Sequence, residues 1–224
     1  MGGPKWPLTP PTPESALGQL RKSLSLYANI RPVEILTPSL LTLSPLKSSI
    51  AQGVNLVIIR ELTGGVYYGK RREADSTLDM ASDLDIYHRH EIERITRLAG
   101  TLAMQHSPPL RVTSLDKANL LAACGRLWRA VVDKVMGEEF PQVEVQHMLI
   151  DAAAMVMVKE PQRLNGVVLT SNMFGDIISD EASVIPGSIG LLPSASLDGL
   201  PTGTVKGLYE PIHGRSPPKL HIRY

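Results

Sequence analysis

The sequence is poor in cysteine, in aromatic residues and in net charge. Its 224 residues include one cysteine, Cys124, which excludes an intramolecular disulfide framework and a multi-cysteine zinc site. Aromatic residues make up 4% of the chain, so a surface that stacks nucleic-acid bases is not expected. Lysine plus arginine number 23 and aspartate plus glutamate 22, a balance that lacks the basic footprint of a nucleic-acid-binding protein.

Long apolar runs are also missing. A membrane-spanning helix needs about 20 apolar residues, and the segment that comes closest, from Met148 to Val158, is interrupted by Asp151. No targeting segment is visible, because the first seven residues lack the apolar stretch of a signal peptide. We therefore expect a cytoplasmic protein with neither a membrane nor a nucleic-acid partner, and a single thiol fits that reducing compartment.

Several common site motifs are absent as well. The chain has no G-x-G-x-x-G dinucleotide fingerprint, no G-x-x-x-x-G-K-[ST] phosphate loop, no G-x-S-x-G nucleophile elbow and no H-E-x-x-H zinc motif. The rest of the composition is that of a globular protein. Hydrophobic residues make up 43% and charged residues 20%, which allows a sizeable core to be buried.

Hydrophobic spacing indicates strands that alternate with helices. Apolar runs typical of strands lie at residues 54–59, 111–115, 143–145 and 166–170. Helical spacing covers residues 91–104, 121–135, 151–158 and 174–185, and a further helix begins near Thr12-Pro13-Glu14. Residues 70–86 are polar and are expected to form a loop or a protruding arm. This alternation favours an α/β architecture.

Asp176 and Asp180 give the sharpest local signal. Four residues apart on a predicted helix, both carboxylates project from one face, where a divalent cation between them would offset their repulsion. Asp151, at the start of another predicted helix, is a candidate third ligand, and an all-oxygen site favours Mg²⁺ or Mn²⁺. The alternative is a solvated acidic helix face, which the spacing alone favours.

Basic residues occupy positions that suit a small anionic ligand. Arg21, Arg31 and Arg60 each interrupt or end an apolar segment, and three arginines could clamp a dicarboxylate through bidentate hydrogen bonds. Lys117 follows a predicted strand, at the kind of strand end where α/β folds bind ligands, and a lysine there could shuttle a proton. Tyr67 and Tyr68 follow a glycine turn, and one of them could act as an acid. The alternatives are surface arginines, an exposed loop lysine and a packed tyrosine.

Ordered motifs connect these residues to a known family. They are Gly2-Gly3-Pro4-Lys5-Trp6, Tyr27-Ala28-Asn29-Ile30-Arg31-Pro32, Arg60-Glu61-Leu62-Thr63-Gly64-Gly65-Val66-Tyr67, Ser114-Leu115-Asp116-Lys117-Ala118-Asn119, Asn172-Met173-Phe174-Gly175-Asp176 and Leu208-Tyr209-Glu210-Pro211-Ile212-His213-Gly214. From residue 2 to residue 214, the chain resembles the isocitrate/isopropylmalate dehydrogenase family, in particular its fungal-type 3-isopropylmalate dehydrogenases.

The resemblance implies a two-domain, non-Rossmann α/β fold whose first domain is incomplete here. Residues 1–26 and 187–224 would be remnants of the cofactor-binding domain, and residues 27–186 the central substrate, metal and dimerisation domain. The implied activity is the NAD-dependent oxidative decarboxylation of 3-isopropylmalate to 4-methyl-2-oxopentanoate in leucine biosynthesis. The implied assembly is a homodimer with shared active sites, in which Lys117 and Asp151 serve the partner subunit's cleft.

By the same resemblance, each candidate residue acquires a role. The substrate would be held by Arg21, Arg31, Arg60, Asp151 and Leu17. The ligands of Mg²⁺ or Mn²⁺ would be Asp151, Asp176 and Asp180. Lys117 would help remove the hydroxyl proton, and Tyr67 would protonate the enol after carbon dioxide departs. The NAD site would include Gly3, Glu14, Glu210, His213 and Gly214.

The chain also departs from the family pattern. The family extends beyond both ends of this sequence, so truncation at both ends is expected. Gly18 stands where a leucine is expected beside the isopropyl group, Ala152 follows the metal aspartate where asparagine or serine is usual, and Pro218 replaces an aspartate that contacts the adenosine ribose. The alternative hypothesis is therefore a catalytically inactive, truncated fragment that acts at most as a dimerisation module.

Overall fold

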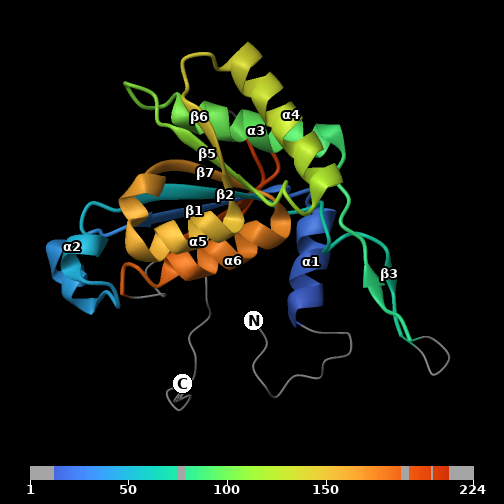
Figure 1. Ribbon diagram of the computed structural model, residues 1–224, viewed down its shortest axis with the longest axis horizontal. Helices are drawn as coiled ribbons and strands as arrows, with labels where there is room; N and C mark the ends of the chain where they lie inside the picture. Colours follow the sequence, from blue (N-terminus) through green and yellow to red (C-terminus); the bar gives the residue numbers. More distant parts are fainter. Residues whose placement is uncertain (1–12, 75–78, 188–191, 203, 212–224) are drawn as a thin grey trace.

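A seven-stranded mixed sheet forms the centre of the chain (Figure 1). The computed structural model describes residues 13–74, 79–187, 192–202 and 204–211. In spatial order the strands are β6 (Val145–Leu149), β5 (Val112–Asp116), β7 (Gly166–Thr170), β2 (Asn55–Glu61), β1 (Ala28–Glu34), β8 (Pro193–Leu197) and β9 (Gly207–Pro211). The first four are parallel to one another, and β1, β8 and β9 join by antiparallel pairing. The predicted α/β architecture is confirmed.

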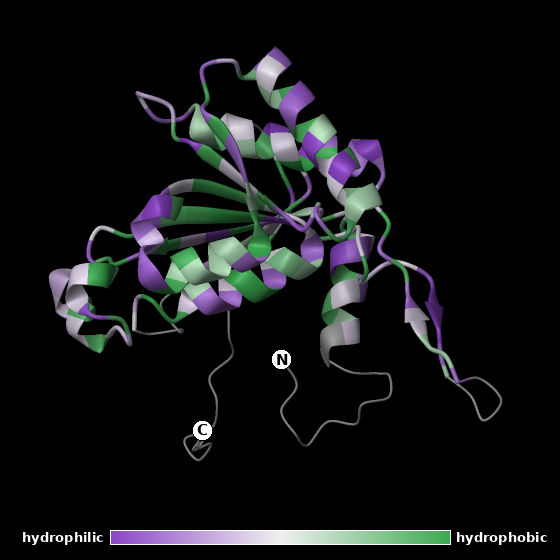
Figure 2. Ribbon diagram, viewed as in Figure 1, coloured by the Kyte–Doolittle hydropathy of each residue, from purple (hydrophilic) through white to green (hydrophobic). Residues whose placement is uncertain are grey.

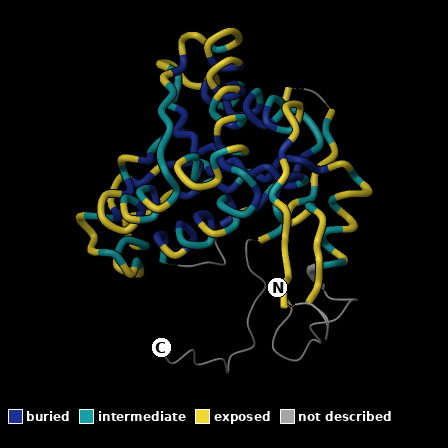
Figure 3. The backbone as a smooth tube through the Cα atoms, turned by 45° about the vertical axis from the view of Figure 1, so that its right-hand side comes forward, coloured by how far each residue is buried: buried dark blue, intermediate teal, exposed yellow. Residues whose placement is uncertain are grey.

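Helices cover both faces of this sheet. One face carries α3 (Arg89–Ala103) and α4 (Ala122–Glu139), and the other carries α5 (Ile150–Lys159) and α6 (Asn172–Ser183) (Figure 1). Each layer encloses its own apolar core: Ile59, Leu98 and Trp128 belong to the first, and Ile58 and Ile178 to the second. Figure 2 shows the green, hydrophobic strands between the helix layers, and Figure 3 shows the same region as buried.

Shorter elements surround this core. They are α1 (Pro13–Ser23), α2 (Ser48–Ala51), two 3₁₀ helices (Pro38–Leu43 and Pro161–Leu164) and the hairpin of β3 (Arg71–Arg72) with β4 (Ser82–Asp83). The hairpin extends away from the sheet as a protruding, exposed arm, as the polar sequence predicts (Figures 1 and 3). Within the described ranges, no helix combines the length and the apolar character that a membrane crossing requires.

The alternation of strand residues decides which side chains face α6. In β2, Ile58 packs into the core beneath α5 and α6 while Ile59 packs into the opposite one, so Arg60 returns to the α6 side. The antiparallel register sets Asn29 opposite Arg60 and Arg31 opposite Ile58. Arg31 and Arg60 therefore emerge from neighbouring strands on the same face of the sheet.

Most predicted elements are present, with differences at the polar strands. The strand predicted at residues 143–145 begins instead at Val145 and runs to Leu149. The apolar pattern does not reveal β1, β8 or β9: buried polar residues such as Asn29 and Ser196 interrupt it in β1 and β8, and β9 has no buried residue. The sheet continues from β1 into β8 without a break, while the division into residues 27–186 and flanking remnants stays a prediction.

Candidate active site

Arg31 and Asp180 form one of two arginine–aspartate pairs between the sheet and α6. Arg31 is buried, and its Nη1 donates to Oδ1 of Asp180 at 2.9 Å and to the hydroxyl of Ser179 at 2.6 Å. Its Nε donates to the amide oxygen of Asn29 at 2.8 Å. Asp180 is 37% exposed on its side chain, so an ion or a ligand from solvent can reach it.

Arg60 and Asp176 form the second pair, one helical turn earlier. Nη1 of Arg60 contacts Oδ1 of Asp176, and the Tyr67 hydroxyl donates to Oδ2 of the same carboxylate at 3.0 Å. The Arg60 guanidinium also lies 5.9 Å from the centre of the Tyr67 ring. Asp176 and Asp180 thus share one face of α6, as their spacing predicts, and each contacts a buried arginine.

Arg21 completes a group of three arginines. It lies in the last turn of α1, and its Nη2 is 3.5 Å from Oε1 of Glu210 in β9. Among the described residues, its buried Nε has no hydrogen-bond partner. Leu17 lies one turn earlier on the same helix and is half-buried. An unpaired guanidinium N–H beside two other arginines is suited to bind a carboxylate.

The electrostatics of the group favour an anionic ligand. Burial lowers the pKa of Arg60 and of Arg21, and for both residues Arg31 lowers the pKa further while the nearby carboxylates raise it. The pKa of Tyr67 is raised by its partial burial and by the negative charge of Asp176. Tyr67 therefore keeps its proton at neutral pH. The guanidinium groups of the three arginines repel one another, and a second negatively charged partner would reduce that repulsion.

Lys117 and Asp151 form a separate pair. Lys117 follows β5, Asp151 lies in the first turn of α5, and their Nζ and Oδ1 atoms are 2.7 Å apart. This contact lowers the pKa of Asp151, whose side chain is 58% exposed. Within the part of the chain that the structure describes, no three acidic, histidine or cysteine side chains gather at one point. One copy of the chain therefore does not bring Asp151 to Asp176 and Asp180.

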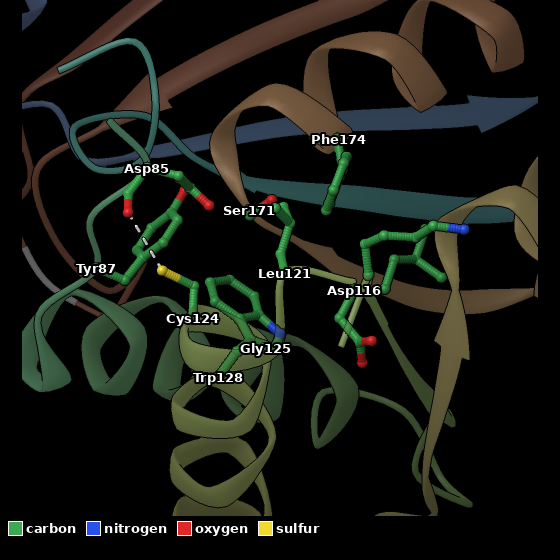
Figure 4. A pocket seen from close by; sticks show the side chains of 11 residues that line it. Asp85, Tyr87, Asp116, Leu121, Cys124, Gly125, Trp128, Ser171 and Phe174 are labelled. Carbon is green, nitrogen blue, oxygen red and sulfur yellow. Dashed lines mark hydrogen bonds between the residues drawn. The ribbon is translucent and has the colours of Figure 1, made fainter. Parts of the chain in front are cut away.

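A small surface hollow lies beside Lys117, at the carboxyl ends of β5 and β7. Figure 4 shows Tyr87, Cys124 and Trp128 on one side and Phe174 on the other, with the Cys124 thiol donating to the backbone oxygen of Asp85 at 3.3 Å. None of the three arginines lines this hollow. The Lys117 region and the arginine group are thus two separate surfaces of one copy.

The donor set fits a hard divalent cation. Asp176 and Asp180 offer carboxylate oxygens from successive turns of one rigid helix, and both are partly open to solvent. Oxygen ligands of this kind suit Mg²⁺ or Mn²⁺ better than zinc. In the structure, Arg31 and Arg60 are paired with some of these carboxylate oxygens.

Part of the predicted NAD site cannot be placed. Gly3, His213, Gly214 and the substituted Pro218 lie outside the described residues, and for Glu14 only the helical backbone is described. Glu210 is described, and it contacts Arg21 as given above.

Three further polar residues support the site and were not singled out from the sequence. Asn29, Glu61 and Asn172 are each at most 1% exposed. The Glu61 carboxylate accepts hydrogen bonds from the backbone N–H groups of Thr63 and Gly64 and from Arg94. Asn29, Glu61 and Asn172 each lie close to a predicted arginine or within one of the family motifs. A polar residue at such a position, where it needs hydrogen-bond partners once buried, is the signal that could have identified them.

Comparison with known proteins agrees with this fold. The isocitrate/isopropylmalate dehydrogenase family matches residues 1–221. A 3-isopropylmalate dehydrogenase from Alternaria alternata is 61% identical over 222 residues, and the alignment covers 97% of this chain and 60% of that protein. A 3-isopropylmalate dehydrogenase from Kodamaea ohmeri is 58% identical, also with 97% and 60% coverage. The chain spans about 60% of the length of these curated relatives.

Solved structures give the same result. An isocitrate dehydrogenase from Methylococcus capsulatus is 34% identical with a TM-score of 0.74, and the match covers 93% of this chain and 58% of that one. A protein from Thermus thermophilus is 29% identical with a TM-score of 0.74, and the match covers 93% of this chain and 39% of that one. The mixed sheet between two helix layers is an α/β fold of the kind found in isocitrate dehydrogenases. The chain belongs to the isocitrate/isopropylmalate dehydrogenase family.

Proposed function

We propose that this chain supplies the active-site residues for NAD-dependent oxidative decarboxylation of 3-isopropylmalate to 4-methyl-2-oxopentanoate, a reaction of leucine biosynthesis. The observation that carries the proposal is the group of Arg21, Arg31 and Arg60 facing Asp176 and Asp180. The identity to curated 3-isopropylmalate dehydrogenases supports the same substrate.

The arginines would bind and orient the diacid. Each guanidinium presents parallel N–H groups that match a carboxylate, and the half-buried surroundings strengthen the contacts. The pairs with Asp176 and Asp180 would be exchanged for pairs with substrate carboxylates. Asp176 and Asp180, with Asp151 of the partner subunit, would then hold Mg²⁺ or Mn²⁺, which when bound lowers the pKa of the substrate hydroxyl and stabilises an enolate.

The proton transfers fall to Lys117 and Tyr67. NAD, when bound, would supply the hydride acceptor, and Lys117 of the partner subunit would take the hydroxyl proton of the substrate as its carbinol carbon becomes a ketone. The bond to the neighbouring carboxylate then breaks, carbon dioxide leaves, and the electron pair forms an enolate. The Tyr67 hydroxyl would donate its proton to the enolate carbon. Its raised pKa keeps that proton in place until then.

A homodimer with shared sites is part of this proposal. Lys117 and Asp151 lie apart from the arginine group in one copy, so a second copy would have to supply them. Helices α5 and α6 also expose apolar side chains, with Met155 66% and Ile177 57% exposed. An apolar face of this kind suits contact with a second subunit.

The test is reduction of NAD by 3-isopropylmalate, measured with and without Mg²⁺. It is run on this chain and on a version extended at both ends with the corresponding segments of the Kodamaea ohmeri relative. Turnover that needs both the diacid and the cation supports the proposal. Absence of turnover by the extended version overturns it.

The second candidate is the alternative named from the sequence, a non-catalytic dimerisation module, and the coverage of about 60% of the relatives is the observation that bears on it. That candidate predicts that the 224-residue chain forms dimers but neither reduces NAD nor binds it. Turnover by the chain as written excludes this candidate.

A further inference from the structure

Asn172 is a buried amide at the junction of β7 and α6. It is the first residue of α6 and is 1% exposed. It precedes Asp176 by four residues, so both lie on the same face of the helix. A buried amide has two acceptor lone pairs and two N–H donors that need partners. Its partners therefore show what the residue does.

Every hydrogen-bonding group of the Asn172 side chain is used. Its Oδ1 accepts from Nε of Arg60 at 3.1 Å and from Nη2 of Arg60 at 2.9 Å. Its Nδ2 donates to the backbone oxygens of Leu62 and Gly64, both at 3.0 Å. Its backbone N–H donates to the Tyr87 hydroxyl at 2.8 Å. One side chain thus fixes an arginine and a turn together.

The contact with Arg60 orients the guanidinium without neutralising it. Asn172 occupies Nε and Nη2, and Nη1 is left for a ligand or for Asp176. An amide oxygen carries only a partial charge, so the positive charge of Arg60 remains available. A carboxylate at this position would form an ion pair with Arg60 and would repel a substrate carboxylate.

The contacts with the turn set the position of Tyr67 relative to Arg60. Residues 62–65 lead from β2 to Tyr67. Asn172 binds two carbonyls of this segment, and Glu61 binds the N–H groups of Thr63 and Gly64, the latter at 2.6 Å from Oε2. A Cβ on Gly65 would lie 2.6 Å from the Tyr87 hydroxyl oxygen, so the Tyr87 side chain packs directly against the turn. The turn has little freedom to move.

We propose that Asn172 is a positioning residue that presents the Arg60 guanidinium to a substrate carboxylate and holds it in register with Tyr67. This role rests on the proposed function above. It acts through Arg60 and the turn, and Asn172 itself does not touch the substrate. It follows that an amide, rather than any residue of similar size, is required at this position.

The test compares Asn172→Asp with the parent in the extended, dimeric enzyme. The variant keeps the shape, loses both N–H donors and adds a negative charge. The KM for 3-isopropylmalate is expected to rise roughly 10- to 100-fold, because the new carboxylate pairs with Arg60 and repels the substrate carboxylate, with little change in the KM for NAD. Calorimetric binding of 3-isopropylmalate should weaken by the same factor. Asn165→Asp is the matched control, because Asn165 bonds Asn55 N–H and the Gly53 oxygen away from the site.

A cycle with Arg60→Lys separates positioning from general stability. If Asn172 acts through Arg60, Asn172→Asp should change the KM by less than about twofold in the Arg60→Lys background. Asn172→Ser, which removes the amide without adding charge, carries the test if Asn172→Asp does not fold. A folded Asn172 variant with the parent KM, or independent effects of the two substitutions, overturns the inference. Failure of the parent to turn over 3-isopropylmalate refutes the proposed function instead.

Discussion

Arg31 of β1 and Asp180 of α6 lie 2.9 Å apart, from Nη1 to Oδ1, and Arg60 and Asp176 form a second pair of the same kind one helical turn earlier. The residues proposed for the substrate are therefore paired with those proposed for the cation. A dianion alone would draw the arginines away from both aspartates, and a cation alone would draw the aspartates away from both arginines. Binding of both together leaves no charge uncompensated.

We accordingly predict that Mg²⁺ and 3-isopropylmalate increase each other's affinity. A coupling of about tenfold or more is expected from free energies typical of linked sites. Calorimetric titration of Mg²⁺ with and without the diacid measures it, and the reciprocal titration must give the same factor. Asp176→Asn should remove the coupling and the metal-dependent turnover while the fold persists. Equal Mg²⁺ affinity in both titrations of the parent would contradict the paired arrangement.

Replacement of Lys117 by methionine should block the chemical step and leave substrate binding intact. Methionine keeps the length of the side chain but cannot accept the hydroxyl proton. We expect kcat for NAD reduction to fall by about 100-fold or more, the usual contribution of acid–base catalysis, with little change in the affinity for 3-isopropylmalate. Lys134→Met, on the exposed side of α4, serves as the control. A Lys117→Met enzyme with the parent kcat would remove Lys117 from the mechanism.

Two glycines in helices should respond in opposite directions to alanine. A Cβ at Gly18 meets no atom within 4 Å, whereas a Cβ at Gly125 would lie 2.5 Å from the Cα of Ala118. Gly18→Ala should stabilise the fold by about 0.5–1 kcal/mol through helix propensity, which raises Tm by roughly 1–4 °C. Gly125→Ala should lower Tm, because the added Cβ would clash with the backbone of Ala118, which cannot shift without a cost in free energy. Thermal unfolding of both variants checks this, and a lower Tm for Gly18→Ala would contradict the open surroundings of Gly18.

Glu61 should make stability depend on pH in the mildly acidic range. Burial raises the pKa of Glu61, and the hydrogen bonds from Thr63 and Gly64 only partly offset it. Between the ordinary pKa and this raised value, the folded state holds a proton that the unfolded state has lost. The free energy of unfolding therefore falls as the pH rises through that window.

Glu61→Gln should reduce that fall, since glutamine has no proton to lose. Urea unfolding measured from about pH 4 upward, in steps of about half a unit across the range of carboxyl titration, gives the slope for both proteins. Glu139→Gln, at an exposed carboxylate that pairs with Arg97, tests whether loss of any carboxylate has the same effect. An unchanged slope in Glu61→Gln would show that Glu61 is fully compensated by its partners.

Sequence reasoning succeeded where one apolar period dominates. The helices around Ile95, Trp128 and Ile178 follow a stripe that buries one face, and β7 is a continuous apolar run. It failed at β1, because Asn29 and Arg31 occupy buried positions that an apolar pattern would fill. Those residues are buried only because the Ser179 hydroxyl, Asp180 and β8 provide partners from distant parts of the chain, which local spacing cannot reveal.

In the candidate site, too, local spacing predicts some features and long-range contacts determine the others. The i, i+4 spacing of Asp176 and Asp180 was sufficient to place both carboxylates on one face. The pairing of each with a particular arginine depends on the antiparallel register of β1 and β2, which the sequence does not encode locally. Asn172 was visible within a motif, yet its contacts with Arg60 and with the turn required the folded chain.

The most direct test of the account is a crystal structure of the dimer with Mn²⁺ and 3-isopropylmalate bound. The anomalous signal of manganese locates the cation independently of the side chains. We predict a peak at coordination distance from Asp176 and Asp180 and from Asp151 of the partner subunit, with the diacid on the three arginines. A dimer in which Asp151 of the partner subunit lies far from Asp176 and Asp180 would contradict the proposed chemistry.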